Sequence, residues 1–121
     1  MAYTEFGEFF RILRIKNHEV LADAKEFLGV STAFISSVEC GKKAIPADWF
    51  EKITNHYKLS VEKQTKLKEA IDNSKKSIRI DLATANSLQK QVALQFQRSF
   101  DEDDEETLKE IQKVLERRSK K

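Results

Sequence analysis

The sixteen residues from Leu28 to Lys43 decide the fold of this chain: Leu-Gly-Val-Ser-Thr-Ala-Phe-Ile-Ser-Ser-Val-Glu-Cys-Gly-Lys-Lys. Gly29 can take the left-handed conformation that ends a helix, because it has no Cβ to clash. Ser31 is placed to cap a new helix, since its hydroxyl can accept a hydrogen bond from a first-turn amide. The stretch therefore predicts the end of one helix, a tight turn and a short second helix over about 32–39.

This short helix has one apolar side and one side of small, uncharged residues. Ile35 and Val38 are spaced to face inward. Gly41 ends the helix, and two lysines follow it. Two helices joined by a tight turn are typical of a DNA-binding helix-turn-helix, whose second helix lies in the major groove. The outer side, which would face the DNA bases, carries Thr32, Ala33, Ser36 and Ser37.

Apolar residues at three- and four-residue steps predict an all-α fold, with five helices in residues 1–73. The expected helices run from a Thr4 cap to Lys16, over about 18–28, over about 32–39, from Pro46 to Tyr57, and over about 61–73. We interpret 1–73 as the DNA-binding domain and 74–121 as an extension for dimerisation or interaction.

The extension begins with a strict apolar and polar alternation, Ile78-Arg79-Ile80-Asp81-Leu82, which predicts a short strand. This strand either pairs with its copy in a second subunit, which we favour, or lies extended over the helical domain. Two helices follow, and we interpret the acidic run 101–106 between them as a solvated loop with favourable charge at a helix start. With the strand, their apolar stripes form the expected dimer surface: Ile78, Ile80, Leu82, Leu88, Val92, Phe96, Phe100, Leu108, Ile111 and Leu115.

Composition narrows the class of protein. The chain has 121 residues, 40% of them hydrophobic, and no apolar run long enough for a membrane span. Its N-terminus lacks a secretory signal pattern, so we expect a cytoplasmic protein. One cysteine and two histidines are too few for a disulfide or a zinc site. With three glycines and no catalytic motif, we expect neither an enzyme nor a cofactor.

The charge balance of the expected DNA-binding part is neutral. Residues 1–72 hold 11 Lys and Arg against 11 Asp and Glu, whereas nucleic-acid-binding domains are often basic. Binding must therefore depend on where individual charges lie. We expect Lys16, Lys42 and Lys43 to contact phosphates, together with the capping residue Ser31.

The chain resembles the Cro and lambda-repressor type of helix-turn-helix domain, also called the xenobiotic-response-element family, from about residue 6 to 57. The resemblance is carried by three stretches, FGEFFRILR (6–14), FLGVS (27–31) and ISSVECGKK (35–43). Leu21 stands where family members usually carry a phosphate-contacting Gln, and Ala24-Lys25 replaces a common Leu-Ala pair, so no backbone contact is carried over for that helix.

The resemblance implies roles for individual residues. Thr32, Ala33 and Ser37 match positions that meet base edges in the family, and their small side chains imply weak direct readout supplemented by DNA shape and water. Arg14 and Glu39 match an ion pair that holds the recognition helix and can leave the arginine near a phosphate.

Two residues of the motif allow more than one interpretation. Phe34 could press against thymine methyl groups, but we favour packing with Val38 against the fourth helix near Trp49. Cys40 could be a redox switch, although a small filler residue is the simpler interpretation.

We therefore expect a transcriptional regulator, in the first place a repressor, that binds an inverted-repeat operator as a homodimer. The alternative is an antitoxin whose C-terminal part neutralises a toxin protein while the N-terminal part represses the shared operon. A sensor of a small ligand is a third and weaker hypothesis.

Overall fold

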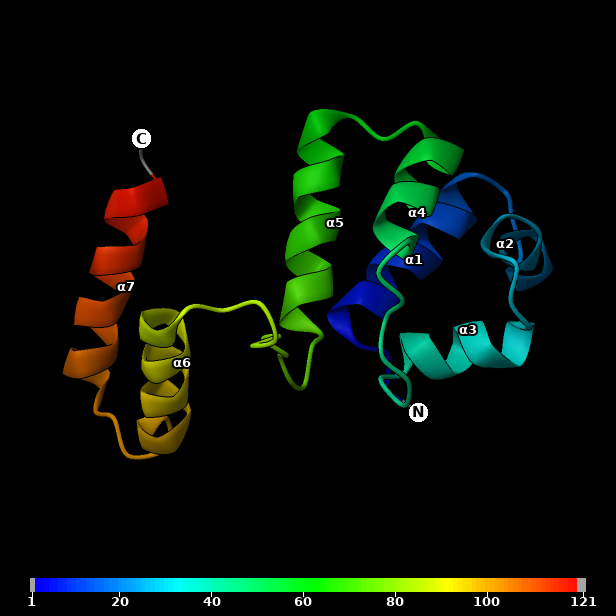
Figure 1. Cartoon of the computed structure of the whole chain (residues 1–121). Helices are drawn as coiled ribbons and strands as arrows, with labels where there is room; N and C mark the ends of the chain where they lie inside the picture. The colour runs from blue at the N-terminus through cyan, green and yellow to red at the C-terminus, as the bar shows by residue number, and fades with distance from the viewer. Residues whose placement is uncertain (1, 120–121) are drawn as a thin grey trace. The chain divides into compact units, whose positions relative to one another are not determined.

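Seven helices appear in the computed structural model, which describes the backbone of residues 2–119 and the side chains of residues 2–117 (Figure 1). The chain divides into two compact units, Met1–Ile78 (unit 1) and Arg79–Lys121 (unit 2). The expected all-α class is confirmed for the described residues. The helices are α1 (Glu5–Lys16), α2 (Leu21–Leu28), α3 (Thr32–Glu39), α4 (Trp49–Tyr57) and α5 (Val61–Asn73) in unit 1, and α6 (Ser87–Ser99) and α7 (Glu105–Ser119) in unit 2.

The core of unit 1 is built around aromatic rings from α1 and α4. The rings of Phe6 and Phe10 lie 6.0 and 6.2 Å from that of Trp49, and all three side chains are buried. Tilted and edge-on pairs of this kind add to the stabilisation that burial alone provides. The inner faces of all five helices complete the core with Leu13, Ala24, Leu28, Ile35, Val38, Ile53 and Leu67.

Capping residues set the helix boundaries, and two boundaries differ from the sequence expectation. Thr4 caps α1, as expected, and Ser60 caps α5. The second helix starts at Leu21, not near residue 18, because His18 has a positive φ of 57°. The fourth starts at Trp49 instead of Pro46; the Pro46 carbonyl accepts only an isolated turn bond from the Trp49 amide.

The expected strand at Ile78–Leu82 is wrong, since residues 2–119 contain no strand at all. The alternation had no second strand to pair with in the described chain. Local bonds turn this segment toward α6 instead: the Asp81 carboxylate accepts a bond from the Ala83 amide, and the Leu82 carbonyl accepts one from the Ala85 amide.

Unit 2 is a helical hairpin whose helices α6 and α7 run in opposite directions (Figure 1). Asn86 caps α6 by accepting from the Gln89 amide, while the Gln89 side chain accepts from the Asn86 amide. Asp104 accepts a bond from the Thr107 amide at the start of α7. None of the described helices has the length and apolar character needed to cross a bilayer.

Candidate nucleic-acid interface

A tight turn between α2 and α3 presents α3 to the surface. Gly29 ends α2 with a φ of 70°, and its amide bonds to the Lys25 carbonyl at 2.9 Å. A Cβ at this position would meet nothing within 4 Å, so the backbone conformation alone favours glycine. Ser31 accepts a bond from the Phe34 amide at 3.1 Å, which makes it the N-cap of α3 as expected.

The two sides of α3 differ in burial as the spacing predicted. Ile35 and Val38 are buried in the core. Ala33 is exposed, and the expected base-contacting residues Thr32, Ser36 and Ser37 are half-buried. The outer side of α3 is therefore small, neutral and partly accessible to solvent.

Phe34 is half-buried, and its ring meets that of Trp49 edge-on at 6.1 Å between centroids. This contact agrees with the packing interpretation of Phe34. It also ties the first turn of α3 to the start of α4.

A glycine-based cap fixes the chain where it leaves α3. The Gly41 amide bonds to the Val38 carbonyl, and the Lys42 amide bonds to the Ser37 carbonyl, at 3.0 and 2.8 Å. This is the Schellman pattern, and Gly41 supplies its left-handed residue with a φ of 79°. Because the backbone is fixed, the exposed side chains of Lys42 and Lys43 start from defined positions at the end of α3.

Lys76 joins this end of α3 from the far end of unit 1. A Cβ built on Gly41 would lie 3.7 Å from the Lys76 ammonium nitrogen, so the two residues are close neighbours. We call Lys42, Lys43 and Lys76 the exit lysines. Lys76 was not predicted as part of this site, since 33 residues separate it from Lys43 in the chain.

Hydrogen bonds between the end of α5 and the start of α1 explain the position of Lys76. The Ser74 hydroxyl accepts from the Phe6 amide at 2.9 Å and donates to the Ala70 carbonyl at 2.7 Å. The Asn73 amide group donates to the Glu5 carboxylate at 3.0 Å. These bonds hold the segment after α5 next to the α1 N-terminus, and this N-terminus lies against the end of α3.

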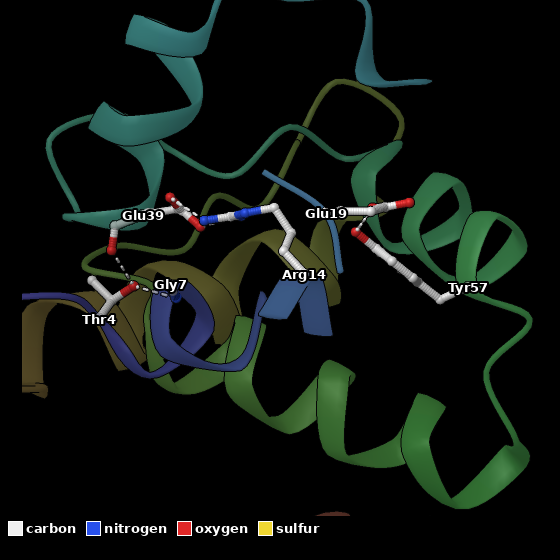
Figure 2. Close-up of polar contacts among 6 residues, drawn as sticks. All are labelled: Thr4, Gly7, Arg14, Glu19, Glu39 and Tyr57. Carbon is white, nitrogen blue, oxygen red and sulfur yellow. Dashed lines mark hydrogen bonds and ion pairs between the residues drawn. The ribbon is translucent and has the colours of Figure 1, made fainter. Parts of the chain in front are cut away.

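Arg14 and Glu39 form a buried ion pair behind α3 (Figure 2). The two guanidinium nitrogens donate to the two carboxylate oxygens at 2.7 and 3.3 Å. The guanidinium carbon also lies 4.7 Å from the centre of the Phe10 ring. Only 8% of the Arg14 side chain is exposed. The two residues therefore form the expected ion pair, but the burial of Arg14 leaves little of its side chain accessible to a phosphate.

The backbone carbonyl of Glu39 is held as firmly as its side chain (Figure 2). It accepts bonds from the Thr4 amide at 2.9 Å and the Thr4 hydroxyl at 3.0 Å. The same hydroxyl accepts from the Gly7 amide at 3.0 Å. A Cβ on Gly7 would collide with the Glu39 carbonyl oxygen. Only glycine lets α1 approach α3 so closely, a requirement that the sequence pattern did not reveal.

A second polar cluster fixes the segment before α2. Glu19 accepts a bond from the Tyr57 hydroxyl at 2.7 Å (Figure 2). A Glu19 carboxylate oxygen also lies 3.0 Å from the His56 ring nitrogen. Burial, reinforced by the bond to Glu19, raises the pKa of Tyr57 well above its ordinary value. The His56 ring stacks on Phe27 of α2 at 3.8 Å. Helix α4 thus contacts both α2, through His56 and Phe27, and α3, through Trp49 and Phe34.

The remaining predicted contacts are more scattered. Lys16 is exposed in the last turn of α1. Cys40 is half-buried with a free thiol. Nowhere in the described part of the chain do three His, Cys, Asp or Glu side chains converge as a metal site would require.

The expected dimer residues lie mainly around an apolar groove in unit 2. Ile78 is exposed and belongs to unit 1. Phe100 is also exposed, and Leu108 is half-buried, outside the groove lining. The other seven expected residues line the groove: Ile80, Leu82, Leu88, Val92, Phe96, Ile111 and Leu115.

Comparison with known proteins does not place this chain in a family. Neither a protein-family model, nor a characterised protein, nor a solved structure matches the chain.

Proposed function

We propose that this chain is a sequence-specific DNA-binding regulator that inserts α3 into the major groove. The observation that carries the proposal is the small, neutral and partly exposed outer face of α3, whose C-terminal end lies beside the three exit lysines. A helix of this kind can approach base edges closely, and cations at its end suit the flanking phosphates.

The rigid support behind α3 favours this function over a passive surface helix. The Glu39 carboxylate is bound to Arg14, and its carbonyl is bound to Thr4. Base contacts require that a helix be held in a fixed orientation, and buried, charge-assisted bonds provide such stiffness. We propose base contacts from Thr32, Ala33, Ser36 and Ser37 and phosphate contacts from the exit lysines.

Operator binding requires more than one such helix. A single α3 spans too few base pairs for high specificity, so we propose a homodimer on a two-fold-symmetric site. Repression is the expected mode of regulation, because a dimer seated on an operator excludes other proteins from that DNA.

The first experiment is selection from random duplex DNA at moderate salt. Enrichment of a two-fold-symmetric sequence would support the proposal. The variant Ala33→Glu with Ser37→Glu should lose binding, because two carboxylates would then face the DNA. The control, Asn55→Glu with Thr65→Glu on α4 and α5, adds the same charge at exposed positions. Equal binding by both variants would refute the assignment of α3.

The alternative function, an antitoxin, is favoured by one observation, the open apolar groove of unit 2. If a partner protein fills that groove, purified chain alone should remain monomeric. A chain that dimerises through the groove would count against this alternative.

A further inference from the structure

Unit 2 does not bury its own apolar residues. Between residues 79 and 117 no side chain is buried. A groove of about 1000 Å³ runs along α6 and α7, and its lining includes Leu88 and Val92, which are 69% and 56% exposed. A unit of about 40 residues seldom has enough core to be stable alone and commonly needs a partner. The groove therefore requires an occupant.

Four charged residues form a stripe along α7, and we call it the charged stripe. Glu106, Glu110, Lys113 and Arg117 follow one another at steps of four, three and four residues, so they share one side of the helix. All four are exposed. Val114 is 54% exposed and lies between this stripe and the side of α7 that lines the groove.

Two of the three steps along the stripe bring like charges together within the single helix, and only the middle step, from Glu110 to Lys113, joins opposite charges. Glu106 precedes Glu110 by four residues, and Lys113 precedes Arg117 by four residues. Like charges at this spacing repel each other on a helix surface. None of the four makes an ion pair with another described residue of the chain.

The same order is complementary to itself when reversed. We infer that unit 2 pairs with a second copy of this chain, with the two α7 helices antiparallel across a two-fold axis. An axis between Glu110 and Lys113 sets Glu110 opposite Lys113 of the second copy. It also sets Glu106 opposite the second copy's Arg117. A two-fold axis repeats each contact, so four ion pairs form.

The charges of the two halves of α7 extend this complementarity. Residues 105–110 carry three acidic side chains and one basic one, whereas residues 111–117 carry two basic and one acidic. Parallel α7 helices would place like charges together at both ends. Antiparallel helices place opposite charges together, and the groove beside the stripe supplies apolar surface for the same partner.

This inference specifies the dimer of the proposed function, but it does not depend on DNA binding. It is tested without DNA, by sedimentation velocity over a range of protein concentrations. A chain that does not self-associate but still binds DNA would contradict this inference alone. A chain that self-associates but does not bind DNA would contradict the proposed function alone.

The test uses charge reversal along the stripe. We expect Glu106→Lys with Glu110→Lys, and separately Lys113→Glu with Arg117→Glu, to raise the dimer dissociation constant at least about tenfold, since each creates like-charge pairs. Combining all four reversals in one chain should restore the dissociation constant to within about threefold of that of the unmodified chain, because the ion pairs form again with opposite polarity. A mixture of the two double variants should form a heterodimer.

The combined variant distinguishes pairing from a simple effect on the helix. Reversed charges oppose the helix dipole, so if α7 stability alone mattered, the fourfold variant would associate most weakly. Far-ultraviolet circular dichroism checks that helix content is retained. Glu62→Lys with Glu69→Lys on α5 is the charge-matched control and should leave the dissociation constant unchanged.

Three results would overturn the inference. The first is an unmodified chain that stays monomeric at all concentrations, which would leave the groove to another protein. The second is charge reversals that leave the dimer dissociation constant unchanged. The third is a fourfold variant that associates more weakly than either double variant.

Discussion

Replacing Glu39 by Gln tests whether the buried ion pair holds α3 in place. The substitution keeps the shape of the side chain and removes its charge, so the guanidinium of Arg14 stays buried without a counter-charge. The two residues are 6% and 2% exposed. Breaking a buried pair from one side costs about 3–5 kcal/mol. Because Gln still offers one acceptor oxygen, we expect a loss of about 3 kcal/mol in the free energy of unfolding.

The assay follows urea unfolding through the emission of Trp49. It is the only tryptophan and is 1% exposed in unit 1, so its signal reports on that unit. For a unit of this size, about 3 kcal/mol corresponds to a fall of roughly 12–24 °C in melting temperature. Glu62→Gln is the matched control, since its ion pair with Lys66 is exposed and should contribute less than about 1 kcal/mol.

A double substitution, Arg14→Met with Glu39→Leu, completes the test. Removing both charges leaves no buried ion without a partner, so this variant should be more stable than Glu39→Gln. The reasoning would be refuted if Glu39→Gln cost no more than Glu62→Gln. It would also fail if the double variant were the less stable of the two, because charge would then not be the cause.

Three further predictions concern the surroundings of α3. Gly7→Ala should destabilise unit 1 by about 1–3 kcal/mol in urea unfolding, because its Cβ would press on the Glu39 carbonyl; an unchanged midpoint would contradict this. The raised pKa of Tyr57 means that the folded state keeps the phenol proton longer than the unfolded state, so this stabilisation is complete below about pH 10 and is lost above it. Tyr57→Phe should therefore show a smaller alkaline loss of unfolding free energy. Lys76→Ala should weaken DNA binding and lower its salt dependence, whereas Lys75→Ala, which removes a lysine paired with Asp72, should change both less.

Local rules of helix formation predicted much of unit 1 from the sequence. Gly29 and Ser31 set the turn and the start of α3 because their effects act within four residues. The inward positions of Ile35 and Val38 followed from helical spacing alone. Arg14 and Glu39 could be paired only through a family resemblance, since no rule of spacing connects residues on separate helices.

Features that depend on contacts between separate helices were not predicted from the sequence. The need for glycine at position 7 arises from a carbonyl 32 residues away, and Lys76 reaches α3 only because Ser74 binds the start of α1. The strand expected at Ile78–Leu82 failed for the opposite reason. Alternation describes what a strand needs from its own residues, but a strand also needs a neighbour, and Asp81 bonds locally to begin a turn instead.

The exit lysines resolve the apparent conflict between the neutral charge of residues 1–72 and the proposed DNA-binding function. Counterion release depends on how many phosphates are contacted, not on the net charge of the domain. Three lysines at the end of each α3, used twice in a dimer, would contact about six phosphates, and the slope of log affinity against log salt should then be about −5. Glu39, the only acidic residue in α3, is buried and bound to Arg14, so no carboxylate of this helix faces the proposed DNA surface.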